Sequence, residues 1–254
     1  MPKNLLSFLI SILLLASLSY SVFPQTSSFK WGLRAGLNFP SVNENYFAGA
    51  EVLPETDEVS VRIVTDQRRL NTYNAGLYFE YWFSSKFIMQ LNALYNRKGV
   101  KVKSEMDGIV VDNGQTINIF MVSQQTLDLA YFSTPLMVKY AFGRSGSARP
   151  FITIGPEIGY LLSAETSDFE ADFQAYITEL GGGAFEINEP GGDVKDDLES
   201  TEVAFNFGAG LIIPLGQMDL FLDGWYSLGL TKINKEGEND IKNNLITLNI
   251  GLGF

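Results

Sequence analysis

The carboxy-terminal segment, residues 244–254, alternates between apolar and small or polar side chains. Its even-numbered positions from Ile246 to Phe254 are all aliphatic or aromatic, whereas the odd-numbered positions after Leu245 hold only Thr, Asn and Gly. Successive side chains of a β-strand point to opposite faces of the sheet. The segment is therefore predicted to be a strand with one wholly apolar face and one narrow, polar face.

Seven further segments show the same period of two. Each is long enough for the ~9–11 tilted residues with which a strand crosses a bilayer. They are residues 29–39, 73–83, 87–103, 132–142, 152–162, 203–213 and 219–230.

The connections between these segments alternate in length. Short connections are 84–86, 143–149 and 214–217, and long ones are 40–71, 104–124, 164–201 and 231–243. Short periplasmic turns and long extracellular loops, with both termini on the periplasmic side, are typical of outer-membrane barrels. The sequence thus predicts an all-β fold, an eight-stranded antiparallel up-and-down transmembrane β-barrel.

Two of the long connections contain hairpin signals. Asp112-Asn113-Gly114 separates the apolar runs 109–111 and 116–122, which is a pattern for a tight turn. Strands three and four are therefore expected to continue beyond the membrane as an exposed ribbon. In the long connection 164–201, residues 173–180 and 184–188 flank the glycines 181–183, which is a second hairpin pattern. If the two strands of that hairpin are counted, the barrel has ten strands, and this is the alternative to eight.

The amino terminus has the pattern of a secretory signal peptide. Lys3 precedes an apolar run over residues 5–18, and small residues follow it. We expect residues 1–22 to be removed by cleavage between about residues 19 and 25, leaving a barrel domain over residues 27–254. The apolar run is shorter than the ~20 residues that a membrane-spanning helix needs.

A soluble eight-stranded carrier of the lipocalin type also alternates, but with its apolar face inward. The polar faces here are rich in glycine, which suits a narrow interior better than a solvated exterior. The apolar faces carry aromatic side chains near the strand ends, as a lipid-facing girdle does. We therefore predict that lipid surrounds the barrel, in the outer membrane.

Five charged residues lie on the polar faces of different strands. An isolated charge inside a narrow barrel is costly, so these side chains are expected to pair in a hydrogen-bonded network. Such a network serves either as an ion or proton path or as a structural plug, and eight strands leave an interior that side chains just fill. The plug is the favoured interpretation, formed by Arg34, Glu80, Lys139, Glu157 and Asp223.

Residues 164–202 contain twelve acidic residues and one basic residue, a local net charge of −11 that equals the charge of the whole chain. No basic patch is present to neutralise phosphates, which argues against nucleic acid as a partner. Four acidic residues in this segment offer oxygen ligands for Ca²⁺, although their spacing is not that of an EF-hand. A solvated surface loop is favoured over this weak calcium site at Asp193, Asp196, Asp197 and Glu199.

The chain has no histidine and no cysteine. This excludes a Ser-His-Asp triad, a histidine-ligated metal and a disulfide framework. A hydrolase with paired carboxylates would need a distinctive pair, and no spacing singles one out. The sequence therefore predicts a protein that is not an enzyme and has no cofactor.

Several segments resemble the outer-membrane β-barrel family common in Bacteroidetes, the porin family with the PorT-like proteins. The matching segments are residues 31–38, 76–83, 94–99, 131–140 and 155–162. The resemblance implies an outer-membrane location and an eight-stranded barrel, and it implies no substrate.

The leading hypothesis is a non-enzymatic outer-membrane barrel with a side-chain-filled interior, whose extracellular loops make contacts or reinforce the envelope. The alternatives are a passive pore for small solutes and an accessory component of an envelope secretion machine, as PorT-like proteins are. Expected partners are outer-membrane lipid and envelope proteins that bind the loops. The protein is expected to be a monomer.

Overall fold

The computed structural model describes residues 29–43, 49–52, 59–112, 115–144, 146–177, 181–235 and 240–254. The predicted signal peptide lies outside these residues. All described strands belong to one 12-stranded antiparallel sheet, so the predicted all-β architecture is confirmed. No described helix is long or apolar enough to cross a membrane.

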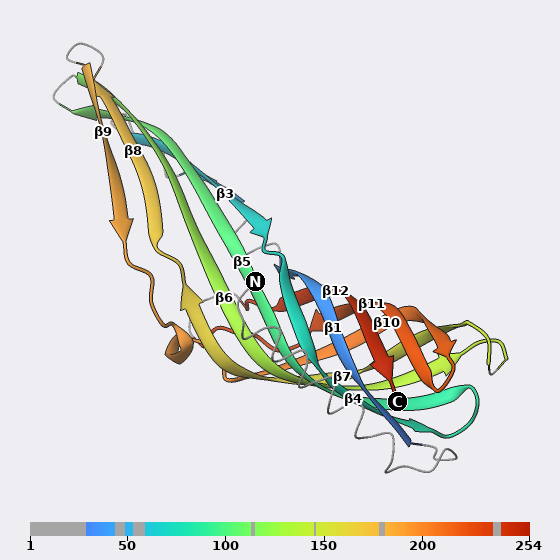
Figure 1. Ribbon diagram of the computed structural model, residues 1–254. Helices are drawn as coiled ribbons and strands as arrows, with labels where there is room; N and C mark the ends of the chain where they lie inside the picture. The colour runs from blue at the N-terminus through green and yellow to red at the C-terminus, as the bar shows by residue number, and fades with distance from the viewer. Residues whose placement is uncertain are drawn as a thin grey trace, which may run out of the picture.

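Eight of the strands pair in a ring. Each pairs with its neighbour in chain order, and the last pairs with the first (Figure 1). Every one of them contains a segment with the predicted alternation. They are β1 (Phe29–Val42), β4 (Thr72–Trp82), β5 (Phe87–Asp112), β6 (Gln115–Ala141), β7 (Arg149–Thr166), β10 (Thr201–Leu215), β11 (Met218–Gly229) and β12 (Asn243–Gly253).

The pairing of β1 with β12 joins the two ends of the chain. The register runs from Gly32↔Gly253 to Val42↔Asn243. Phe254 continues the contact, because its backbone N–H donates to the carbonyl of Trp31 at 2.8 Å and the two rings lie 5.2 Å apart. The terminal strand therefore occupies the place that its sequence predicts.

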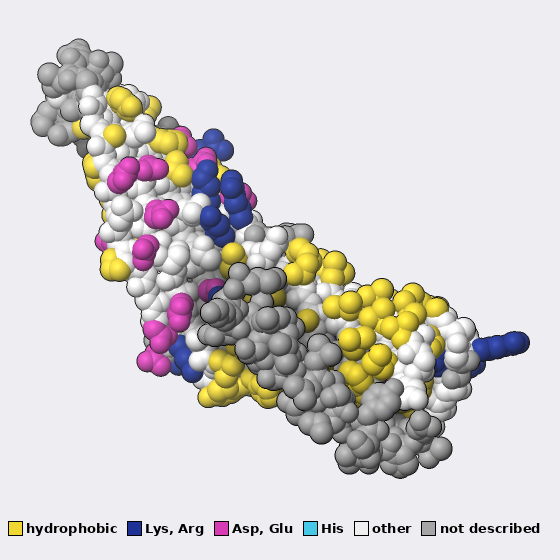
Figure 2. Space-filling model, viewed as in Figure 1, with side chains coloured by type: hydrophobic (Ala, Val, Ile, Leu, Met, Phe, Trp, Pro, Cys, Tyr) yellow, Lys and Arg dark blue, Asp and Glu magenta, His cyan; other side chains and the backbone are white. Residues whose placement is uncertain are grey.

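The ring has apolar side chains outside, and the polar side chains of its strands point inside, together with apolar clusters at its two ends. On β12, Leu248 is 54% exposed whereas the neighbouring Thr247 is 4% exposed, and β7 alternates in the same way. Figure 2 shows hydrophobic side chains gathered over the ring, while most of the visible charged side chains lie over the part of the sheet that projects from it. This is the reverse of the arrangement in a soluble barrel.

Beyond the ring, β5 and β6 continue and carry four more strands. These are β2 (Gly49–Val52), β3 (Val59–Arg69), β8 (Phe169–Ile177) and β9 (Gly181–Glu189). The order across this region is β2-β3-β5-β6-β8-β9, and we call it the projecting sheet (Figure 1). The predicted ribbon is confirmed, because β5 and β6 stay paired as far as Asp112↔Gln115.

Two sequence predictions in this region were wrong. Residues 40–71 were expected to form a loop, but β2 and β3 lie there. The alternation in β3 is masked because Val64 falls among the polar positions, and the strand is instead fixed by pairing with β5 along its whole length. In the acidic hairpin, Gly181 to Gly183 were expected to form the turn, whereas they begin β9.

The connections at the other end of the ring are short. Gly216 has a φ of +70° in the turn between β10 and β11, a conformation that favours glycine. Outside the projecting sheet, the described parts of the long connections contain little regular structure: one turn of 3-10 helix, η2 (Lys195–Asp197), and two isolated bridges, Glu165↔Asp193 and Leu198↔Asn234.

Candidate functional site

The interior of the ring is the candidate site, because most of the buried charged side chains converge there. The five charges predicted from sequence are all buried, and their exposed fractions lie between 0% and 7%. They do not form one continuous network. The structure brings four of them together as two pairs and places the fifth with partners that the sequence prediction had missed.

The first pair is Arg34 on β1 with Asp223 on β11. Arg34 Nη2 donates to Asp223 Oδ2, and Arg34 Nη1 donates to Asn92 Oδ1 at 3.0 Å. The guanidinium carbon lies 4.0 Å from the centre of the Trp225 ring, which faces the interior from β11. Asp223 also accepts a hydrogen bond from Asn249 Nδ2 at 2.9 Å. Both charges are thus compensated by groups from four strands.

The second pair is Glu80 on β4 with Lys139 on β6. Lys139 Nζ donates to Glu80 Oε1 at 2.8 Å, and Trp82 Nε1 donates to Glu80 Oε2 at 3.2 Å. The ammonium lies 4.7 Å from the ring centre of Phe151 and 4.6 Å from that of Phe221. Ring faces attract cations, so Lys139 is held by one carboxylate and two aromatic rings.

Glu157, the fifth predicted charge, lies further from the short turns. Asn206 Nδ2 donates to Glu157 Oε2 at 2.9 Å, and Lys98 Nζ is 3.9 Å from Glu157 Oε1. Lys98 donates to Glu202 Oε1 at 2.8 Å, and Glu202 Oε2 accepts from Asn243 Nδ2 at 3.0 Å. This cluster therefore contains one ammonium and two carboxylates.

Lys98 and Glu202 were missed by the sequence prediction, yet a signal for them exists. Lys98 falls in the same alternate positions of the predicted segment 87–103 as the polar residues Asn92 and Asn96. Glu202 shares the polar face of β10 with Asn206. Lys98 lies within the predicted segment 87–103 and Glu202 directly precedes the segment 203–213, so the alternation itself indicates both residues.

Amide side chains fill the space between the charged clusters. Asn38 lies at the centre of this group: its Nδ2 donates to Asn96 Oδ1 at 2.6 Å, and its Oδ1 accepts from Asn74 Nδ2 at 2.8 Å and from Thr247 Oγ1 at 3.2 Å. Asn74 also donates to Asn249 Oδ1 at 3.2 Å. Hydrogen bonds thus link four neighbouring strands across the interior.

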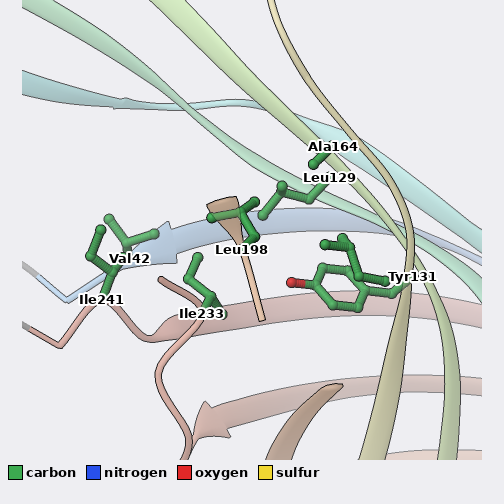
Figure 3. Packing of buried hydrophobic residues seen from close by; sticks show 8 residues of the cluster. Val42, Leu129, Tyr131, Ala164, Leu198, Ile233 and Ile241 are labelled. Carbon is green, nitrogen blue, oxygen red and sulfur yellow. The ribbon is translucent and has the colours of Figure 1, made fainter. Parts of the chain in front are cut away.

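Apolar side chains close the two ends of the interior. Figure 3 shows the cluster at the end with the long connections, where residues of β1, β6 and β7 meet residues of the connections themselves. Its members are Val42, Leu129, Tyr131, Leu161, Ala164, Leu198, Ile233 and Ile241. The cluster at the end with the short turns consists of Tyr78, Ile88, Ala141, Phe151, Ile212 and Phe221.

Glycine at two positions makes room for one of these rings. A Cβ added to Gly253 would lie 2.5 Å from the Tyr78 hydroxyl, and a Cβ added to Gly32 would also overlap the Tyr78 ring. The two glycines face each other in the closing pair of β1 and β12. The glycine-rich polar faces thus allow a large aromatic side chain to fill the narrow interior.

The candidate calcium ligands are not gathered into a site. Among the described residues, no three acidic side chains lie close enough together to hold a metal ion. Asp193 Oδ1 accepts from the backbone N–H of Lys195 at 2.9 Å, and the backbone carbonyls of Asp196 and Asp197 accept from Lys235 at 2.6 and 3.1 Å. The contacts of these residues order the connection itself.

On the projecting sheet, Lys103 Nζ donates to Glu105 Oε1 at 2.7 Å. This hydrogen bond to the ionised form lowers the pKa of the Glu105 carboxyl from its usual value. The pair lies on the outer surface of β5, away from the interior, and it contributes nothing to the candidate site.

The charged side chains of the described interior are engaged in pairing and packing. Its carboxylates accept hydrogen bonds from lysine, arginine, asparagine or tryptophan, and no histidine or cysteine exists in the chain. The arrangement is suited to filling the ring and holding its strands in register.

The model of one protein family, described as the outer membrane protein beta-barrel domain, matches residues 17–235. No curated protein matches the sequence.

The solved structures that this chain matches share little sequence with it. The N-terminal β-barrel domain of OprF from Pseudomonas aeruginosa is 12% identical, with a TM-score of 0.34, and the match covers 90% of this chain and 98% of that one. Neisserial surface protein A is 11% identical, with a TM-score of 0.38 and coverage of 89% and 96%. OprG from Pseudomonas aeruginosa is 13% identical, with a TM-score of 0.35 and coverage of 91% and 99%. At TM-scores below 0.5, these structures add nothing to the family match.

Proposed function

The chain belongs to the family of outer-membrane protein β-barrel domains, and on that premise we propose that it is a non-enzymatic eight-stranded barrel, closed by its own side chains, that presents a β-sheet at the cell surface. The strands of the ring cross the outer membrane. Both termini lie on the periplasmic side, and a signal peptide directs export.

The observation that carries this proposal is the continuous filling of the interior. Apolar clusters lie at both ends, and ion pairs and amides occupy the space between them. A passive pore would need a continuous polar path past Leu129 and Phe151, which are 1% exposed each. Packed side chains of this kind are expected inside an eight-stranded barrel.

The projecting sheet is the part of the protein to which we assign contacts at the cell surface. It continues from the end of the ring that carries the long connections, which is the extracellular end of barrels of this kind. Its strands β5 and β6 are far longer, at 26 and 27 residues, than a bilayer crossing requires. We assign it to contacts with other molecules or envelope components, made by a monomeric barrel anchored in lipid.

Membership of the narrower Bacteroidetes group with the PorT-like proteins is part of the same proposal. The segments at residues 31–38 and 131–140 support it, and both lie within ring strands.

Solute release from vesicles tests whether the barrel is closed. Purified protein is folded into vesicles loaded with a small sugar, beside a general porin as the positive control. We expect release at the rate of protein-free vesicles. Release at the porin's rate would instead establish the passive pore.

Epitope insertion tests the orientation. An epitope inserted after Pro190, next to β9, is expected to be labelled by antibody on intact cells. A matched epitope inserted after Gly146, in a short turn, is expected to be labelled only after the outer membrane is opened. The reverse pattern would place the projecting sheet in the periplasm and contradict the proposal.

A further inference from the structure

The outermost strand of the projecting sheet has an open edge. Within the described part of the chain, β9 pairs only with β8, and the sheet order ends with it. An unpaired edge offers a row of backbone N–H and C=O groups to another strand. Natural edges are usually protected by charged side chains, above all lysine, by proline or by a bulge. The nine residues of β9 contain neither lysine nor proline, and their register with β8 is unbroken.

The outer face at this edge is acidic. Glu170 and Asp172 on β8 and Glu186 on β9 share one face and are all exposed, and neither strand contains a lysine or an arginine. Asp172 and Glu186 stand directly opposite each other. Like charges in that position destabilise a sheet, so a cation from a neighbouring strand would relieve an existing repulsion.

The opposite face at the same edge is apolar except for Glu189 at the end of β9. The Phe173 and Phe185 rings lie 4.7 Å apart across β8 and β9, and Ile187 is opposite Ala171. This face continues across the sheet through Met121 and Met106. A strand added at β9 would therefore meet apolar side chains on one face and carboxylates on the other.

From this edge we propose that β9 accepts an extended polypeptide strand in which apolar and basic residues alternate. The backbone pairing supplies affinity, and the alternation supplies selectivity. The basic side chains lie beside Glu186, with Asp172 one strand further in, and the apolar ones extend the face formed by Phe185 and Ile187. A second copy of β9 fits less well, because its own acidic side chains would join the same face.

The inference rests on the proposed role of the projecting sheet in contacts, and purified protein in detergent micelles suffices to test it. The probe is a labelled nine-residue peptide of alternating lysine and valine, whose binding is followed by fluorescence anisotropy. A peptide with the same lysines, but with prolines in place of the two central valines, keeps the charge and loses backbone donors. We expect it to bind roughly tenfold more weakly, and we expect slowed hydrogen exchange at β9 amides with the first peptide alone.

Charge reversal gives the sharper comparison. The double variant Asp172→Lys with Glu186→Lys is expected to lose roughly tenfold in affinity for the lysine peptide and to gain affinity for its glutamate counterpart. Asp66→Lys with Asp107→Lys is the matched control. It makes the same change in net charge on the outer face of β3 and β5 and should leave β9 protection unchanged.

The proposal would be overturned if the two lysine peptides bound equally well, or if the two double variants had equal effects. Attraction to overall charge would then explain the result. Concentration-dependent dimerisation with protected β9 amides would overturn it in favour of a second copy. None of these outcomes affects vesicle release, so the strand-binding proposal and the closed-barrel proposal fail independently.

Discussion

Lys139 illustrates how single residues keep a charged interior stable. Its ammonium is buried between one carboxylate and two aromatic rings. Removing one partner of a buried pair leaves an uncompensated charge. Replacing both partners by apolar residues removes the desolvation penalty together with the electrostatic attraction.

Lys139→Met is therefore expected to destabilise the folded barrel by about 3–5 kcal/mol, because Glu80 keeps only the hydrogen bond from Trp82. The double variant Lys139→Met with Glu80→Leu should recover most of the loss. Urea unfolding in lipid vesicles, followed by tryptophan fluorescence, measures both. A double variant as unstable as the single one would show that the pair is not the source of the effect.

Glu105 provides a residue-scale test outside the ring. Its pKa lies below the usual value because Lys103 donates a hydrogen bond to the carboxylate. A lowered folded-state pKa means that the stabilising contribution is present above the unfolded-state pKa and is lost as the pH falls through the folded-state value. Lys103→Met should raise the pKa of Glu105 towards its ordinary value in an NMR titration. An unchanged pKa would mean that the hydrogen bond does not form in solution.

Five of the interior charges could be predicted from sequence, but their partners could not. Alternation places Arg34 and Asp223 on polar faces, while their pairing depends on register between strands far apart in the chain. Such register is fixed by many pairings together, so sequence alone did not distinguish two separate pairs from one network.

At the scale of the element, alternation was sufficient wherever a strand meets the apolar outside. β12 is the clearest case, since its apolar positions are exposed and its polar positions are buried. β3 was missed because its position depends on β5 rather than on its own pattern.

Arginine substitutions at two exposed aliphatic residues distinguish a lipid environment from water. Leu248→Arg on β12 is expected to cost about 2–4 kcal/mol in vesicles, the cost of arginine near the middle of a bilayer. Ile109→Arg, on the exposed outer face of the projecting sheet, should change stability by less than about 0.5 kcal/mol. The two side chains are 54% and 45% exposed, so exposure does not explain a difference. Equal effects would place both residues in the same medium.

At the scale of the whole molecule, one continuous sheet serves two environments. The ring turns apolar side chains outward and encloses ion pairs, whereas the projecting sheet carries exposed charges and an open edge. Location and architecture follow from the ring, and contacts with other molecules are assigned to the sheet. The central claim is that the ring conducts nothing because its side chains fill it.

Single-channel recording in planar bilayers tests that claim most directly. The native protein is expected to show no steady conductance. A variant that also shortens the apolar ends, with Leu129→Ala and Phe151→Ala together with Arg34→Ala and Asp223→Ala, should show openings if it folds, which its gel mobility before and after heating would establish. Steady open channels from the native protein would contradict the closed barrel.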